Sequence, residues 1–180
     1  ISNGAEAEIV TTFATKDKSL GYRGISAFVV DKGTRGFSVG KLERKMGLHP
    51  ASVAELIFDD CRIPVTNMLG EEGKGFRVAL EGIDASRVSI AAQALGIAQA
   101  AYDAAVTYAK ERKQFGAEIG RLQAIQWMIA DMATEIDAAR LLIYRAAWLT
   151  RKEGHAPPKE AAMAKLFASE AAHRVCHKAV

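Results

Sequence analysis

Short hydrophobic runs separated by turn residues fill the chain between Ile1 and Leu69. Runs rich in β-branched and aromatic residues that stop at Gly, Asn or Pro are typical of β-strands. The predicted strands are Ile9–Thr12, Ile25–Val30, Phe37–Val39 and Val53–Phe58. This pattern predicts part of a β-sandwich or barrel, with a sheet that these residues alone leave incomplete.

The period of the pattern changes after Gly75, where small and apolar residues recur every three or four positions. That spacing places apolar side chains on one face of a helix, and no proline interrupts the chain between Pro64 and Pro157. The predicted helices run from about Gly75 to Lys113, from about Gly120 to Arg151, and from about Lys159 to the end.

The second predicted helix has the clearest apolar stripe, and we expect this stripe to be core. Its members are Ile125, Ile129, Met132, Ile136, Ala139, Ile143 and Ala147. The first helix is rich in alanine, which allows neighbouring helices to approach closely in an antiparallel bundle. The fold class is therefore α+β, with a partial β domain over residues 1–70 and a helical bundle over residues 71–180. We expect this bundle to be truncated, because the last predicted helix runs to the end of the sequence.

Composition and charge restrict the class of protein. The chain is 49% apolar and 25% charged, as in an ordinary globular domain, and its net charge of +3 gathers in no basic run that would mark a nucleic-acid surface. Charged residues break every apolar run before the roughly 18 residues that a membrane helix needs, so we expect a soluble protein. Cys61 and Cys176 stand far apart, which favours free thiols in a reducing compartment.

The segment between Glu111 and Gln126, ERKQFGAEIGRLQAIQ, holds the strongest candidate chemistry. A basic group, a Phe-Gly break and glutamines stand between two helical runs. Basic residues in a last helical turn also stabilise the partial negative charge of that helix end, so Arg112 and Lys113 have a structural explanation as well.

Several ordered sequence blocks resemble the acyl-CoA dehydrogenase family of flavoenzymes. The segment from Arg112 through Phe115-Gly116 to Gln123 is similar to the family pattern R-x-x-F-G…Q. Further similar blocks are Ile1–Gly4, Gly24–Phe28, Gly36–Val39, Lys45–Gly47, Glu55–Cys61, Gly70–Phe76 and Ala94–Gln99. The resemblance covers essentially the whole chain, and it rests on the order of the blocks rather than on any single one.

This resemblance implies a fold, an activity and partners. Family members have an N-terminal helical domain, a middle β domain and a C-terminal four-helix bundle, and they assemble as dimers or tetramers around FAD. We expect the chain to be part of such a protein, which would dehydrogenate a short or medium acyl-CoA and pass electrons to an electron-transfer flavoprotein. Its expected location is the bacterial cytoplasm or, in a eukaryote, the mitochondrial matrix.

The resemblance also assigns residues to FAD. Ser2 stands where the family has a hydroxyl near flavin N5, and Arg112 aligns with an arginine that binds the FAD pyrophosphate of a neighbouring subunit. Phe115 and Gln123 line the same site, and Gln114 is a further contributor. Without the family, the sequence favours a turn-forming serine at Ser2, because Asn3-Gly4 follows it.

Asp84, Ala85, Ser86 and Arg87 resemble the D-x-x-R segment that contacts acyl-CoA in the family. Asp and Arg three positions apart on a helix also form ordinary surface ion pairs. In most members the catalytic glutamate lies in a later Y-E-G-T segment, and in a minority it precedes the arginine that aligns with Arg87. Ser86 occupies that second position, so we expect the base beyond Val180 and no catalytic base in this chain, which alone should be inactive.

Other interpretations stay open. The parent could be an acyl-CoA oxidase or another flavoprotein on the same scaffold, or the helices could form an assembly module without catalysis. His173, Cys176 and His177 lie on one predicted helix without a fourth ligand, so we predict no metal. His49 stands where many family members have arginine, so the substrate or flavin contact of that arginine is not assigned to His49.

Overall fold

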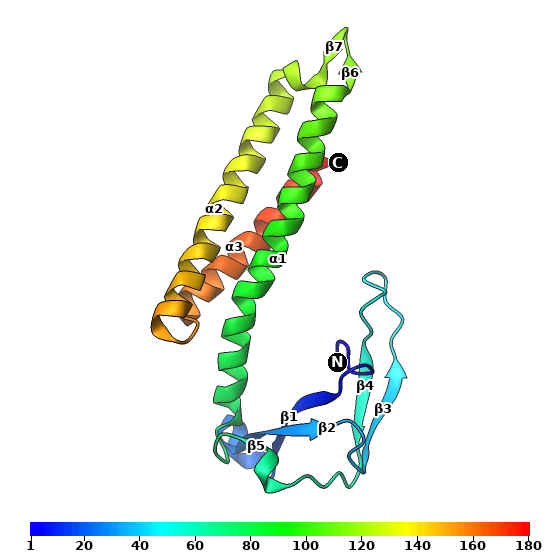
Figure 1. Cartoon of the computed structure of the whole chain (residues 1–180), viewed down its shortest axis with the longest axis vertical. Coiled ribbons are helices and arrows are strands. Elements are labelled where there is room, and N and C mark those ends of the chain that lie inside the picture. Colours follow the sequence, from blue (N-terminus) through cyan, green and yellow to red (C-terminus); the bar gives the residue numbers. More distant parts are fainter. The chain divides into compact units, whose positions relative to one another are not determined.

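The computed structural model describes all residues from Ile1 to Val180, and contacts between residues divide them into two compact units, Ile1–Leu80 and Glu81–Val180. The strands of both main sheets lie in the first unit, and the second consists mostly of helix (Figure 1). Helix α1 (Gly75–Glu111) begins in the first unit and continues through the second. The domain boundary predicted between residues 70 and 71 stays a prediction.

Two antiparallel sheets make up the first unit. Strand β2 (Ile25–Asp31) lies between β1 (Ile9–Thr15) and β5 (Met68–Leu69), and β3 (Phe37–Leu42) pairs with β4 (Ala54–Phe58). The four predicted strands are confirmed, with ends shifted by a few residues. Strand β5 was not predicted, because two residues are too few to show a period.

Short 3₁₀ helices connect the strands. Helix η1 (Lys18–Gly24) joins β1 to β2, and the Asp17 side chain caps it by accepting a 2.8 Å hydrogen bond from the Ser19 amide. Helix η2 (Val65–Asn67) leads into β5. These turns return the chain to the same sheet and leave the loop after β5 beside β2.

Strand β2 forms the buried centre of the first unit. Ser26, Ala27 and Val30 are almost fully buried. A Cβ atom on Gly75 would lie 2.5 Å from the carbonyl carbon of Ser26, so the first residue of α1 lies directly on the backbone of β2. Glycine at this position allows the strand and the start of the helix to approach each other closely.

The second unit contains the long helices, which are α1, α2 (Gln123–Glu153) and α3 (Pro158–Ala179). Figure 1 shows α1 and α2 side by side in opposite directions. Gly154 ends α2 in the left-handed conformation with φ of 77°, and Pro158 opens α3. The three predicted helices are confirmed, each within about one turn of its predicted ends.

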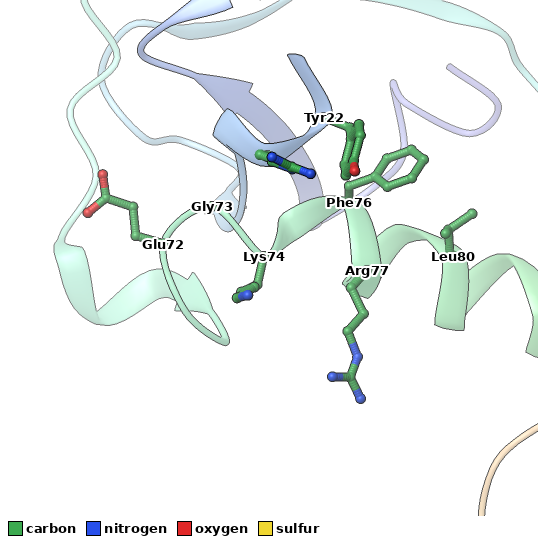
Figure 2. A pocket seen from close by; sticks show the side chains of 8 residues that line it. Tyr22, Glu72, Gly73, Lys74, Phe76, Arg77 and Leu80 are labelled. Atoms are coloured by element: carbon green, nitrogen blue, oxygen red, sulfur yellow. The ribbon is translucent and has the colours of Figure 1, made fainter. Parts of the chain in front are cut away.

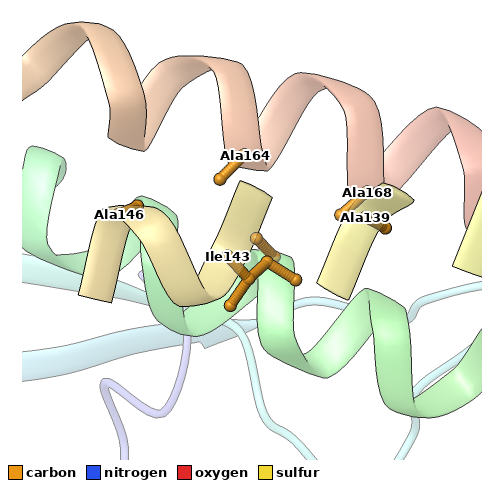
Figure 3. Packing of buried hydrophobic residues seen from close by; sticks show 6 residues of the cluster. Ala139, Ile143, Ala146, Ala164 and Ala168 are labelled. Atoms are coloured by element: carbon orange, nitrogen blue, oxygen red, sulfur yellow. The ribbon is translucent and has the colours of Figure 1, made fainter. Parts of the chain in front are cut away.

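Alanines make most of the core between these helices. One cluster joins Ala91 of α1, Ala139, Ile143 and Ala146 of α2, and Ala164 and Ala168 of α3. Figure 3 shows Ala164 and Ala168 on the side of α3 that faces α2. Small side chains at these contacts bring the helix axes close together.

The predicted stripe of α2 was wrong at one position. Ala147 is exposed, whereas Ala146 is fully buried. The buried positions Met132, Ile136, Ala139, Ile143 and Ala146 alternate steps of four and three, so the step after Ile143 is three. A second cluster around Met132 and Ile136 continues this core, and no helix combines the length and apolarity required to cross a membrane.

Candidate functional site

A small hairpin forms the corner between α1 and α2. After α1 ends at Glu111, β6 (Lys113–Gln114) pairs with β7 (Ala117–Glu118), and the 3₁₀ helix η3 (Ile119–Arg121) leads into α2 (Figure 1). The sequence predicted a break here and no strands, because two-residue strands show no alternation. Gly116 was the available signal, since a glycine between short extended segments marks a turn.

Phe115 is held at the tip of this hairpin in an unfavourable backbone conformation. Phe115 and Gly116 have φ angles of 54° and 81°, as the two central residues of a type I′ turn require. A bulky residue in this left-handed region costs about 1–2 kcal/mol relative to a right-handed one. Phe115 is nevertheless 92% exposed, so packing within this chain does not offset the cost.

Arg112 has a fixed backbone and an unpaired side chain. Its amide donates to the Tyr108 carbonyl at 2.8 Å, and its carbonyl accepts from the Ile119 amide at 2.8 Å. The guanidinium is exposed and forms no ion pair or hydrogen bond in this chain. A planar fork of donors in this setting can bind a phosphate or carboxylate group.

The glutamines predicted for the site lie on both sides of the hairpin. Gln114 pairs with Ala117 in the hairpin and is exposed, and Gln123 is the exposed first residue of α2. The Gln126 side chain donates to the Gly120 carbonyl at 3.1 Å and so ties η3 to α2. Arg112, Gln114, Phe115 and Gln123 thus belong to one corner of the second unit.

Glu118 forms ion pairs with two basic side chains at this corner, and the sequence analysis did not predict a role for it. One carboxylate oxygen lies 2.9 Å from Nε of Arg121 and the other lies 3.8 Å from Nζ of Lys113. A hydrogen bond from its own backbone amide, together with Arg121 and Lys113, holds the pKa of Glu118 below its usual value. The carboxylate therefore stays charged near neutral pH.

Ser2 lies in the first unit, on an edge next to β4. It bridges to Val53, while the Asn3 amide donates to the Ser52 carbonyl at 2.8 Å. Asn3 takes the turn conformation with φ of 56°, so the turn expected from Asn3-Gly4 is confirmed. The Ser2 side chain is exposed, and its contact with flavin stays a prediction.

The predicted substrate segment forms an ion pair on α1. Nη1 of Arg87 lies 2.6 Å from Oδ1 of Asp84, so the ordinary helical pair foreseen as an alternative is present. The Ser86 hydroxyl donates to the Ile83 carbonyl at 2.8 Å. Ala85 is exposed. Whether the segment also binds substrate stays a prediction.

A pocket of about 650 Å³ lies within the first unit and was missed by the sequence analysis. It is lined by Tyr22, Arg23, Glu72, Gly73, Lys74, Phe76, Arg77 and Leu80. The Tyr22 and Phe76 rings lie 5.5 Å apart, and Figure 2 shows them side by side near the start of α1. Aromatic faces beside basic side chains suit a flat ring that carries anionic groups.

The remaining candidate residues form no additional site. His173, Cys176 and His177 do not gather with other ligands, and no group of three or more His, Cys, Asp or Glu residues is arranged to hold a metal ion. Cys61 and Cys176 are free thiols. Nε2 of His49 lies 2.9 Å from the Lys45 carbonyl in the loop between β3 and β4.

Comparison with known proteins identifies the family. The family model for the acyl-CoA dehydrogenase C-terminal domain matches residues 73–180, and the model for the middle domain matches residues 1–61. A mitochondrial short-chain specific acyl-CoA dehydrogenase from Bos taurus is 53% identical over 181 residues, which cover 100% of this chain and 43% of the relative. An acryloyl-CoA reductase (NADH) from Anaerotignum propionicum is 51% identical over 180 residues, or 100% of this chain and 45% of the relative.

The solved structure of butyryl-CoA dehydrogenase from Megasphaera elsdenii has the same fold over these residues. It superposes with a TM-score of 0.94 at 48% identity and covers 99% of this chain and 46% of that chain. The chain spans about half the length of the curated relatives it matches. The two family models, the sequence identities and the structural superposition all agree. The chain therefore belongs to the acyl-CoA dehydrogenase family.

Proposed function

We propose that the full-length protein is an FAD-dependent acyl-CoA dehydrogenase that acts on a short acyl-CoA and passes electrons to an electron-transfer flavoprotein. Relatives that are 48% and 53% identical to this chain are named short-chain specific acyl-CoA dehydrogenases, which supports the substrate class. Mitochondrial and bacterial relatives both occur, so the proposed location is the mitochondrial matrix or the bacterial cytoplasm.

The main structural support for this proposal comes from the corner between α1 and α2. An unpaired guanidinium at Arg112 and an exposed ring on the strained backbone of Phe115 fit a cofactor that offers phosphates and aromatic rings. Gln114 and Gln123 add polar groups on either side. We assign these four residues to FAD of a neighbouring subunit, which makes the proposed protein a dimer or tetramer, and we assign Ser2 to the flavin ring.

FAD, when bound, would supply the acceptor for the hydride that leaves the β-carbon of the substrate. This chain would position both reactants. The Ser2 hydroxyl can donate a hydrogen bond, and Arg112 can neutralise phosphate charge. Ser86 cannot accept the α-proton as a carboxylate does, so we propose that the base is a glutamate elsewhere in the full-length protein.

The pocket in the first unit fits the nucleotide part of coenzyme A. Arg23, Lys74 and Arg77 supply positive charge, and the Tyr22 and Phe76 rings offer apolar faces for a base. The segment Asp84–Arg87 follows on the same helix. If the nucleotide binds there, Lys74→Met should weaken binding of butyryl-CoA and leave binding of butyryl-pantetheine, which lacks the nucleotide, unchanged.

The experiment that tests the function is an anaerobic titration of the full-length protein with butyryl-CoA and octanoyl-CoA, followed by the flavin absorbance. Bleaching of the flavin by butyryl-CoA at a lower concentration than octanoyl-CoA requires would support a short-chain dehydrogenase. Arg112→Ala should lose FAD, whereas Arg151→Ala, which removes another exposed guanidinium without an ion pair, should retain it. Purified protein without flavin, or with flavin that neither thioester bleaches, would contradict the proposal.

A second candidate is reduction of an α,β-unsaturated acyl-CoA, which runs the same chemistry in reverse. The acryloyl-CoA reductase (NADH) among the relatives, 51% identical to this chain, favours it. Consumption of NADH on addition of acryloyl-CoA, without bleaching by butyryl-CoA, would select this candidate.

A further inference from the structure

We propose that Glu118 is a positioning residue for the cofactor corner: by pairing with Lys113 and Arg121 it holds the hairpin and leaves Arg112 as the unpaired arginine for the phosphates of FAD. This inference rests on the proposed FAD site.

The geometry places Glu118 where it can restrain two elements at once. It stands directly opposite Lys113 in the hairpin, and three residues before Arg121 in the turn into α2. Its two carboxylate oxygens contact different cations, at 3.8 Å and 2.9 Å. The Glu118 side chain is 33% exposed, compared with 72% and 76% for its partners, so the carboxylate is the more enclosed member of each pair.

The hairpin needs such a restraint. It has only two backbone pairs, and an isolated hairpin of this size is marginal in water. Its turn also holds Phe115 in the left-handed region. A cross-strand pair of opposite charges stabilises a two-stranded sheet.

Glu118 is also coupled to Arg112 through the backbone. The Ile119 amide, adjacent to Glu118, donates to the Arg112 carbonyl at 2.8 Å. A shift of β7 would therefore move the backbone from which the guanidinium extends. Of the three cations between Arg112 and Arg121, Lys113 and Arg121 are paired with Glu118, and Arg112 has no ion pair.

For Glu118→Gln, the electrostatic effect and the loss of positioning predict opposite changes in the affinity for FAD. The substitution removes a negative charge beside an anion site, so electrostatics alone predicts tighter binding of FAD. Loss of the two pairs predicts weaker binding, because the hairpin and Arg112 are less restrained. Glu111→Gln is the matched control: Glu111 is the exposed neighbour of Arg112 and has no ion pair.

The experiment measures the dissociation constant of FAD for the full-length apoprotein by flavin fluorescence, in wild type, Glu118→Gln and Glu111→Gln. We expect Glu118→Gln to weaken binding about three- to tenfold, and Glu111→Gln to leave it equal or tighter. If Glu118→Gln binds FAD as tightly as wild type or more tightly, the positioning role is overturned while the FAD site stands. A wild type that binds no FAD would overturn the proposed function and this inference with it.

A double-mutant cycle separates positioning from general destabilisation. If Glu118 acts through Arg112, Glu118→Gln should change FAD affinity little once Arg112→Met is present. Melting of the apoproteins shows whether the whole fold has weakened. Full additivity of the two substitutions would overturn the proposal, because an effect on overall stability does not depend on the guanidinium.

Discussion

The Ser26 hydroxyl in strand β2 accepts a hydrogen bond of 2.9 Å from the Gly73 amide in the loop that precedes α1. Ser26 is 5% exposed, so this bond satisfies a buried hydroxyl and fixes the loop to the centre of the sheet. Two residues later, Gly75 begins α1 directly on the same strand. The sheet therefore fixes the position at which the longest helix starts.

Gly75→Ala should destabilise the protein by about 1–3 kcal/mol, because the new Cβ overlaps the β2 backbone and the strand or the helix must shift. Gly82→Ala is the control, since a Cβ there meets no atom within 4 Å. That substitution should stabilise α1 by up to about 1 kcal/mol through helix propensity. Thermal melting of both variants measures the difference, and a Gly75→Ala variant as stable as wild type would contradict the close approach.

Ala164→Leu should cost about 1–3 kcal/mol, because Ala164 is fully buried between α3 and its neighbours and has no room for a larger side chain. Ala162→Leu introduces the same side chain at an exposed position of α3 and should change stability by less than about 0.5 kcal/mol. Urea unfolding measures both variants. Equal effects of the two substitutions would argue against the tight alanine core.

Phe115→Asn should keep or raise stability and yet lower retention of FAD. Asparagine tolerates the left-handed conformation, and Asn-Gly is a preferred type I′ turn, so up to about 1 kcal/mol is gained. Phe115→Ala removes the same ring without that tolerance. The two variants should therefore lose FAD alike while Phe115→Asn melts at the higher temperature. Full FAD content in both would contradict a role for the ring.

The ion pair between Lys16 and Glu72 predicts a pH dependence of stability. Hydrogen bonding and charge from Lys16 lower the pKa of Glu72, and the same contacts with Glu72 raise the pKa of Lys16. A lowered carboxyl pKa contributes stability above the unfolded value, here 4.5, and loses it as pH falls through the folded value. A raised lysine pKa contributes stability below 10.5 and loses it as pH rises through the folded value.

Glu72→Gln should consequently lower the melting temperature by a constant amount between about pH 6 and pH 9, and by nothing in strong acid, where the protonated Glu72 side chain is as neutral as glutamine. Glu71→Gln removes the neighbouring exposed carboxylate, which has no ion pair, and should show no such profile. Identical profiles for the two variants would exclude a contribution from this pair.

The helices and the four longer strands could be predicted because each shows its hydrophobic period over several residues. The hydrophobic pattern failed where burial depends on contacts between residues that are distant in the sequence. Ala146 and Ala147 are chemically identical, and only the packing of α2 against α1 and α3 determines which of the two is buried. The hairpin at Lys113–Glu118 escaped prediction because each strand has two residues and its turn contains phenylalanine, a residue that rarely adopts positive φ.

The candidate site also has features that the sequence predicted and features that it did not. Arg112, Phe115 and Gln123 could be selected from the sequence, because the order of motifs resembles a family. Their exposure, the strained turn at Phe115 and the pairing of Glu118 with two cations could not, since these depend on which atoms meet after folding. The pocket beside Tyr22 and Phe76 was missed because its residues come from two segments about fifty positions apart.

The sequence by itself determined the α+β class, the two periods and the family, because hydrophobic spacing and ordered motifs are properties of the linear chain. Only the tertiary structure decided which alanines form the core and that Gly75 lies on β2. It also decided that Lys113 and Arg121 pair with Glu118 while Arg112 has no ion pair. Burial and ion pairing are set by contacts between distant residues, and their free energies depend on geometry that a linear pattern does not contain.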